Sequence, residues 1–352
     1  MLNVDQHLPQ YKIYIDNSLL KGSEYKVLSV NVQLSISEKA NSAEFVVSAD
    51  YDIDKGSIGG SLVKKLNAGA KVKIEMGYKI TSLIFMGYIN SCNVEYSADG
   101  IYLSVSCLDA RGLLMGNKLW KVFENATPSQ IIKKLLMPLT DYTKGISVTL
   151  PGEVDKEHPE AASDDDDFTY ICNLAKRNNC SFLMQENMLK FGKNVLTEGK
   201  TMLTTYEWGK NLLSFSRQVE LSGQIGEVEV SGRNPDTLET FSASAKLPSG
   251  SGKNANQLCS VIGSKKLKIV SSEIKTKKEA EAYANSIITS LSVKLVSGTA
   301  TMVGDNTILP GRKIKFGKLD KAIDGLYLVS AVTHQFDGSG YITTVNFCRG
   351  TA

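Results

Sequence analysis

Two stretches of this chain repeat one pattern of strands and turns. They cover residues 67–112 and residues 308–350. Both alternate apolar and polar residues, as half-buried strands do, and both are interrupted by Gly and Asp where strands must turn. Gly100 in the first corresponds to Gly340 in the second, and both stretches end in Arg-Gly. The pattern predicts one antiparallel β-barrel module present twice. A chance match between short β meanders is the alternative.

Further strands and a few helices are expected around these two stretches. Residues 27–37 place Leu28 and the alternate apolar residues on one face and Ser, Asn and Gln on the other, which indicates a strand with one wet side. Thr127 and Thr276 each precede a Gln or Glu by three residues, the pattern of a capping box at a helix start.

These elements predict a mainly β fold, a β-rich α+β class, with two similar antiparallel β-barrels and an inserted mixed α/β region. A chain of 352 residues suits two or three domains. We expect residues 1–112 to form the first, tube-like barrel and residues 113–205 an α/β domain with a helix and hairpin. Residues 206–234 and 293–352 would form the second barrel. Residues 235–292 would be an excursion that packs with the α/β domain.

Charge and composition exclude several classes of protein. With 40 basic and 37 acidic residues the net charge is +3, too balanced to predict a specific nucleic-acid partner. Because no run of about 18 apolar residues occurs, no membrane span is expected. The first residues lack the pattern of a secretory signal. The six cysteines include no CxxC pair, so buried free thiols and folding in a reducing cytoplasm are expected.

No catalytic constellation stands out. The four Asp residues at 164–167 could cap a helix or bind a divalent cation, and the cap is favoured because the run lacks the spacing of a Ca²⁺ loop. His7, His158 and His334 are far apart, and His334 is interpreted as a packed histidine on a strand. Since GxSxG, Walker and GxGxxG motifs are absent, we predict no catalytic, cofactor-binding or metal residues, no cofactor, and no enzymatic activity.

Two segments carry a family resemblance. The first has a helix that begins with an aromatic residue and ends in Ala-Lys-Arg-Asn, followed by a hairpin that ends in Phe-Gly. The second begins with Leu-Pro-Gly, contains a His, and ends in Gly-Tyr-x-Thr. The residues concerned are Ser163, Asp167, Phe168, Leu174, Ala175, Arg177, Asn178, Phe191 and Gly192, then Leu309, Gly311, Asp324, Gly325, Tyr327, Val329, His334, Phe336, Gly340, Tyr341 and Thr343. With them the chain resembles the late control protein D, or baseplate hub, family of contractile phage tails. It is also similar to the hub part of type VI secretion spike (VgrG-like) proteins.

The resemblance implies a homotrimer that joins a sixfold tail tube to a threefold central spike. Two barrels in each of three chains would give six quasi-equivalent units, which fits the repeat. Because the chain stops at Ala352, soon after the second stretch, the spike is expected to be a separate protein. Other baseplate proteins, and a tape-measure protein or cargo, are further candidate partners. The chain would be made in the bacterial cytoplasm and become part of a phage tail, a tailocin or an injection particle.

Two other functions stay open at this point. A tail-associated cell-wall hydrolase would need a Glu/Asp pair or metal ligands in a cleft, and no such placement is evident. A receptor- or glycan-binding tail protein would need exposed aromatic residues, of which the sequence suggests few.

Overall fold

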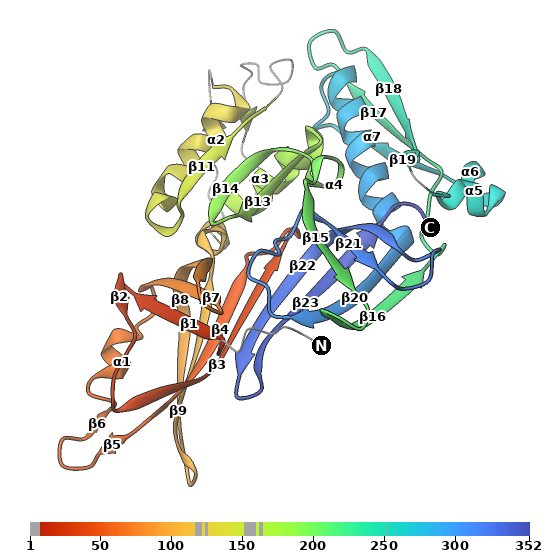
Figure 1. Cartoon of the computed structure of the whole chain (residues 1–352). Helices are drawn as coiled ribbons and strands as arrows, with labels where there is room; N and C mark the ends of the chain where they lie inside the picture. The colour runs from red at the N-terminus through yellow and green to blue at the C-terminus, as the bar shows by residue number, and fades with distance from the viewer. Residues whose placement is uncertain (1–7, 117–121, 124–125, 151–159, 162–164, 251) are drawn as a thin grey trace.

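A single large β-sheet forms the centre of the computed structural model, which describes residues 8–116, 122–123, 126–150, 160–161, 165–250 and 252–352 (Figure 1). Its pairing order is β16-β20-β23-β22-β3-β4-β9-β8-β7-β1-β2, with β21 joining β22 to β15. The fold is thus mainly β with some helices, as predicted. Within the described ranges, no helix is both long enough and apolar enough to cross a lipid bilayer.

The sheet has a first half and a second half. The first half contains β1 (Gln10–Ile15), β2 (Ser18–Leu19), β3 (Tyr25–Ser35), β4 (Ser42–Ala49), β7 (Lys71–Gly77), β8 (Thr81–Ser97) and β9 (Gly100–Leu108), with β5 (Tyr51–Asp52), β6 (Ser57–Ile58) and α1 (Leu62–Lys65) between β4 and β7. The second half contains β15 (Thr201–Glu207), β16 (Leu212–Val219), β20 (Val296–Val303), β21 (Lys313–Gly317), β22 (Gly325–Asp337) and β23 (Gly340–Arg349).

Strand order is the same in the two halves. The first runs β3-β4-β9-β8-β7-β1 across the sheet, and the second runs β16-β20-β23-β22-β21-β15, with the six strands in the same succession along the chain. The last strand of each series, β1 in the first half and β15 in the second, differs in direction. β1 is antiparallel to β7, whereas β15 is parallel to β21. The predicted repeat is therefore present, and it extends beyond the two stretches from which it was inferred.

Four β-bulges confirm the correspondence residue by residue. The register slips at Leu28 in β3 and at Leu213 in β16, and again at Asn90 in β8 and at Ser330 in β22. An unpaired residue in a bulge changes the face to which the following side chains point. Leu28 is consequently 38% exposed and does not join the apolar face predicted for it.

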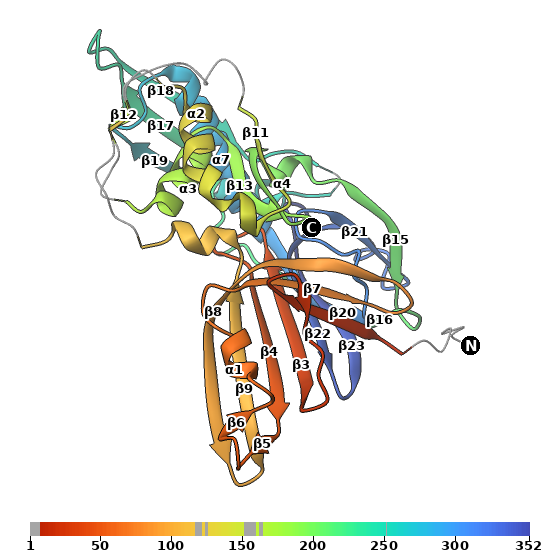
Figure 2. The same ribbon diagram turned by 90° about the vertical axis from the view of Figure 1, so that its left-hand side faces the viewer.

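The prediction that the chain forms two antiparallel β-barrels is wrong, because neither half closes into a barrel among the described residues. Strand pairing among the described residues stays open, and the halves are joined in one sheet (Figure 2). The reason lies in β22, whose beginning pairs with β21 and whose end, Ala331–Phe336, pairs with β3. The matching Arg-Gly ends of the two stretches are not structurally equivalent. Arg349 ends β23, whereas Arg111 lies in a short 3-10 helix after β9.

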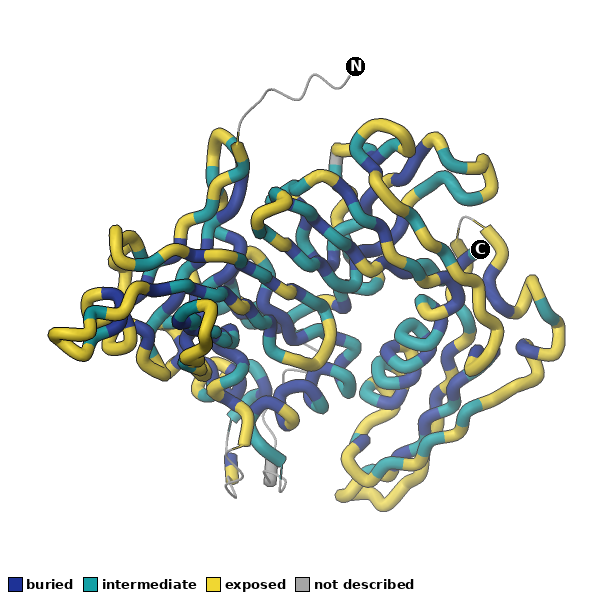
Figure 3. Tube along the Cα trace, turned by 90° about the horizontal axis from the view of Figure 1, so that it is seen from below, coloured by how far each residue is buried: buried dark blue, intermediate teal, exposed yellow. Residues whose placement is uncertain are grey.

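The apolar side of each half carries its own core. Side chains such as Val30, Phe45 and Val105 fill the first, together with Leu62 of α1. The second core contains a group of aromatic rings, in which Phe347 packs against Phe316. Buried positions lie mainly along strands and helices, whereas loops are mostly exposed (Figure 3). The alternation of apolar and polar residues therefore places one face of each half inside.

An α/β unit connects the halves. It contains η1 (Ala110–Leu114), β10 (Val122–Phe123), α2 (Pro128–Leu136), η2 (Met137–Tyr142), β11 (Gly145–Val148), β12 (Glu160–Ala161), α3 (Asp167–Arg177), β13 (Cys180–Gln185), β14 (Met188–Lys193) and α4 (Val195–Glu198). The capping box at Thr127 forms as predicted: its hydroxyl accepts the N–H of Gln130, whose side chain accepts the N–H of Thr127. The hairpin β13–β14 also forms, with Glu186 and Asn187 at positive φ in its turn.

The excursion forms a small sheet covered by one long helix. It contains β17 (Glu227–Arg233), β18 (Thr240–Lys246), α5 (Ala255–Leu258), α6 (Ser260–Ser264), β19 (Lys266–Val270), α7 (Lys277–Ser292) and η3 (Val293–Leu295). Since β17 pairs with β18 and β19 and not with the large sheet, it belongs here and not to the second barrel, where it was expected. Thr276 caps α7, but Glu279 accepts the N–H of Lys275 instead of closing the predicted box.

Candidate functional site

One face of the large sheet is polar across eight adjacent strands, from β16 to β8. We call it the polar face. Its side chains are those that alternate with the buried ones: Ser214, Ser216 and Gln218; Ser297, Thr299 and Thr301; Ile342, Thr344 and Asn346; Ala331, Thr333 and Gln335; Ser29, Asn31, Gln33 and Ser35; Ser42, Glu44, Val46 and Ser48; Tyr102, Ser104 and Ser106; and Ser91, Asn93 and Glu95. All of these are exposed or half-buried.

The polar face is chemically uniform. Rows of directly paired residues cross the junction between the halves, as where Thr344 pairs with Thr333 and Thr333 with Gln33. Hydroxyl and amide groups predominate, and charged side chains are few, as with Glu44, Glu95 and Lys26, which pairs with Ser48. A surface on which small neutral polar groups predominate stays wetted and offers few charged groups that would hold a passing chain.

A cleft of about 1060 Å³ lies where helices α3 and α7 face one end of the polar face. Ser216, Thr299 and Asn346 line it from the sheet side, and Tyr283 lines it from α7. The α/β unit and the excursion both stand at this end, opposite the β8–β9 and β22–β23 turns (Figures 1 and 2). The two ends of the sheet therefore differ: one carries similar hairpin turns and the other carries the added units.

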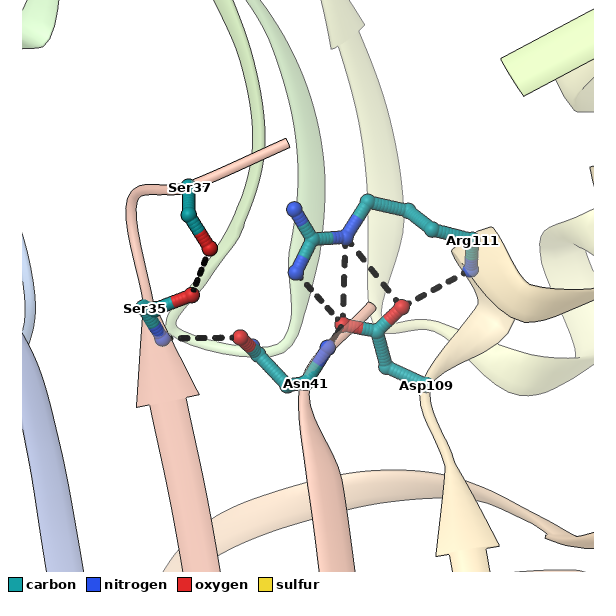
Figure 4. A network of polar contacts seen from close by, with 5 residues as sticks. All are labelled: Ser35, Ser37, Asn41, Asp109 and Arg111. Carbon is teal, nitrogen blue, oxygen red and sulfur yellow. Dashed lines mark hydrogen bonds and ion pairs between the residues drawn. The ribbon is translucent and has the colours of Figure 1, made fainter. Parts of the chain in front are cut away.

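A buried ion pair fixes the end of the first half nearest the α/β unit (Figure 4). Arg111 Nη2 lies 2.8 Å from Asp109 Oδ2, and both side chains are buried. The same carboxylate accepts the backbone N–H of Asn41 at 2.7 Å, and the Asn41 amide oxygen accepts the N–H of Ser35 at 2.9 Å. One carboxylate thus ties the ends of β3, β4 and β9 together.

His334 is the member of the second half that most resembles a catalytic group. Its Nδ1 lies 2.8 Å from the Tyr341 hydroxyl and 3.3 Å from that of Thr343. His334 and Thr343 are fully buried, and burial lowers the pKa of His334 to about 4. In the first half the strand register places Val94, Ile101 and Leu103 at the three corresponding positions. The cluster replaces apolar packing, and we assign it a structural role.

His334 should make the protein sensitive to acid. Because the folded protein holds this histidine neutral, its contribution to stability is complete above a pH of about 6.5 and is lost as the pH falls towards 4. A shift of this size corresponds to about 3 kcal/mol. We expect urea denaturation at pH 7, 5.5 and 4.5 to show this loss in the wild type and a flatter dependence in His334→Gln. Parallel curves for the two proteins would contradict it.

Several predicted positions can now be placed. Asp166 is the N-cap of α3, and its Oδ1 accepts the N–H of Thr169 at 2.7 Å, so the helix-cap interpretation is confirmed for this residue. Asp164, His7 and His158 lie outside the described residues. Over the part of the chain that the structure describes, His, Cys, Asp and Glu form no group of three or more suited to a metal ion.

Sequence reasoning missed the polar face as a whole and the Asp109–Arg111 pair. The wet side of β3 was recognised, but nothing in one strand shows that seven others continue the same surface. The pair lies two residues apart, a spacing common on surfaces, and only the register of β4 and β9 reveals that it is buried.

The solved structures that resemble this chain share one kind of fold. The family model described as the Alg8 N-terminal domain matches residues 5–338. No curated protein matches the sequence. The 43 kDa tail protein of prophage MuSo2 from Shewanella oneidensis is 14% identical with a TM-score of 0.72, covering 97% of this chain and 98% of its own. A tail protein from Neisseria meningitidis is 12% identical with a TM-score of 0.68, covering 97% of both chains.

A secretion protein has the same fold. The E. coli c3393 protein, a component of the type VI secretion system described as structurally similar to the bacteriophage T4 tail proteins gp27 and gp5, is 12% identical with a TM-score of 0.59. The match covers 96% of this chain and 76% of c3393. The expected likeness to phage tail proteins and to type VI secretion hub proteins is therefore confirmed at the level of the fold.

Proposed function

Because this chain belongs to the Alg8 N-terminal domain family and shares its fold with phage tail proteins and a type VI secretion component, we propose that it is a structural baseplate hub. It acts without catalysis in a contractile tail or injection particle. Three copies join a sixfold tail tube to a threefold central spike. The observation that carries this proposal is the repeated six-strand order within one sheet.

Symmetry explains why such a repeat suits a hub. A tube built of six-membered rings rests best on a surface that repeats six times around the axis. Two similar halves in each of three chains provide six similar surfaces, and cyclic closure needs only one kind of contact between chains. The paired turns β8–β9 and β22–β23 end the two halves alike, and we assign this end to the tube.

The parts that differ between the halves suit a threefold partner. The α/β unit and the excursion occur once per chain and stand at the opposite end of the sheet (Figure 1). In this proposal residues 1–112 form the first tube-like unit and residues 113–200 the α/β domain. Residues 201–219 and 296–352 form the second tube-like unit, and the excursion between them packs on the α/β domain through α7 and α3.

The polar face would line the central channel. Its neutral hydroxyl and amide groups suit a wall along which a tape-measure protein or cargo moves without being held. The remaining partners in this proposal are the tube protein, a spike protein and other baseplate proteins. The chain would be made in the bacterial cytoplasm and built into the particle there.

The stoichiometry tests this function. We expect native mass spectrometry of the full chain, alone or mixed with the tube and spike proteins of the same particle, to show three copies of the chain per complex. The spike protein should join in a 3:3 ratio, because the axis of the complex is threefold. A chain that stays monomeric with both partners present, or that assembles as six copies, would contradict the proposal.

A further inference from the structure

A groove of about 430 Å³ lies where the α/β unit meets the second half of the large sheet. Its floor is one face of the small sheet β11-β14-β13, whose other face packs against α2 and α3. The opposite wall is formed by α4, by residues 199–200 after it and by residues 311–312 before β21. Ser147 and Thr149 on the floor are exposed, so no other element among the described residues covers this face.

The strand register shows which side chains project into the groove. Lys190 pairs with Leu183, and Gly192 pairs with Ser181. Directly paired residues share a face of the sheet, and so do residues two apart in one strand, so these four lie on the floor together. A Cβ atom at Gly192 would lie 3.6 Å from the Thr149 carbonyl oxygen, an ordinary contact. A side chain at position 192 would therefore fit the backbone but would take up space in the groove.

Positive charge predominates in the groove. The basic residues that line it are Lys190, Lys193, Lys200 and Arg312, and Glu186 supplies the carboxylate among the described lining residues. That carboxylate pairs with the Arg312 guanidinium and lies 3.9 Å from Lys190 Nζ. Two cations thus share one carboxylate, and positive charge is left over. Charge of one sign gathered in a groove attracts partners of the opposite sign.

We propose that this groove binds an acidic peptide segment of a partner protein, whose carboxylates contact Lys190, Lys200 and Arg312. The proposal names the chemistry of one partner of the proposed hub and rests on that function. Arginine holds a carboxylate through two parallel N–H donors, and lysine holds it as a point charge. The hydroxyl groups of Ser147 and Ser181 line the same floor and offer further donors to the peptide.

A peptide fits this groove better than a single-stranded nucleic acid. Proteins that bind single strands stack the bases on exposed aromatic side chains. Phe191 is the aromatic residue among the described lining residues, and its side chain is buried in the core on the other face of the small sheet. The groove therefore offers charge and hydrogen-bond donors to carboxylates without a surface on which bases would stack.

Glu186 acts in this proposal as an internal competitor. It lies in the turn of the hairpin β13–β14 and occupies the cations that a partner carboxylate would use. Its side chain is 47% exposed, so it is free to move aside when a peptide binds. Removing the charge of Glu186 should therefore strengthen binding, whereas removing the cations should weaken it. A surface ion pair without a binding role would give neither effect.

Binding of a fluorescein-labelled hexaglutamate peptide to the full chain, followed by fluorescence anisotropy at low salt, tests the proposal. Lys190→Gln combined with Lys200→Gln and Arg312→Gln should weaken binding about tenfold, because three charged contacts are lost. Glu186→Gln should strengthen it about threefold, because the internal carboxylate no longer competes.

Two controls separate the groove from charge in general. Lys21→Gln combined with Lys64→Gln and Lys65→Gln removes the same charge from exposed lysines outside the groove and should bind like the wild type. Gly192→Leu leaves the charge unchanged but fills the floor, so it should weaken binding about as much as the loss of the three cations, whereas Gly192→Ala should have a smaller effect. Circular dichroism of each variant checks that it is folded.

Weaker binding in the groove variants and stronger binding in Glu186→Gln, with the lysine control unchanged, support the proposal. No binding of hexaglutamate, or equal weakening in the lysine control, overturns it. Equal binding of a labelled hexathymidylate through the same side chains overturns the assignment to a peptide. Native mass spectrometry separates failure of the groove from failure of the hub: trimers that do not bind the peptide refute only the groove, whereas monomers that persist with tube and spike proteins refute the hub function.

Discussion

Arg111→Met is expected to lower the free energy of unfolding by about 3–5 kcal/mol, the usual cost of removing one partner from a buried ion pair. Both side chains of the pair are buried, and the substitution would leave the Asp109 carboxyl group buried without the guanidinium that balances it. The loss should be greatest in the first half, because the same carboxylate holds Asn41 at the start of β4. Urea denaturation followed by tryptophan and far-ultraviolet signals measures it.

Two controls separate the charge from the packing. Asp109→Asn combined with Arg111→Met should cost less than the sum of the single changes, since no unbalanced charge remains. Lys55→Met removes the exposed ion pair with Asp52 and should change stability little. If Arg111→Met behaves like Lys55→Met, the buried pair does not have the role assigned to it.

Phe347→Ala should destabilise the second half by about 3–5 kcal/mol, as large aromatic truncations in cores do. Its ring stacks on Phe215 at a centroid distance of 5.1 Å and lies 4.9 Å from that of Tyr327 and 5.3 Å from that of Phe316. Removing it opens a cavity among three rings that cannot close together, because each is fixed by a different strand. Chemical denaturation again provides the measurement.

The repeat supplies a matched control for this variant. Cys107 occupies in β9 the position that Phe347 occupies in β23, and it is also buried. Cys107→Ala removes a single sulfur atom and should therefore cost much less. Equal stability losses in the two variants would show that the aromatic cluster is not what holds the second half together.

Local features of this fold were readable from the sequence. Three of them depend only on residues close together in the sequence. These are the alternation in residues 27–37, the capping box at Thr127 and the Asp run at the start of α3. The repeat could also be found, because a duplicated hairpin keeps its turns at Gly100 and Gly340.

Long-range pairing could not be read in the same way. That the end of β22 leaves β21 and joins β3 depends on two segments about 300 residues apart, and neither carries a local signal for it. The direction of β15 and the place of β17 in the excursion are likewise settled by tertiary packing. The candidate site could not be predicted for the same reason. The polar face is made by eight strands, and their order in the sheet cannot be read from the sequence.

Cryo-electron microscopy of the assembled particle, reconstructed without imposed symmetry at the level of this protein, would show how the chains are arranged. We expect three chains around the axis, six similar half-sheets facing the tube, and a continuous polar wall to which each chain contributes eight strands. Six copies of the chain in the ring, or three copies whose two halves lie at unrelated distances from the axis, would contradict it.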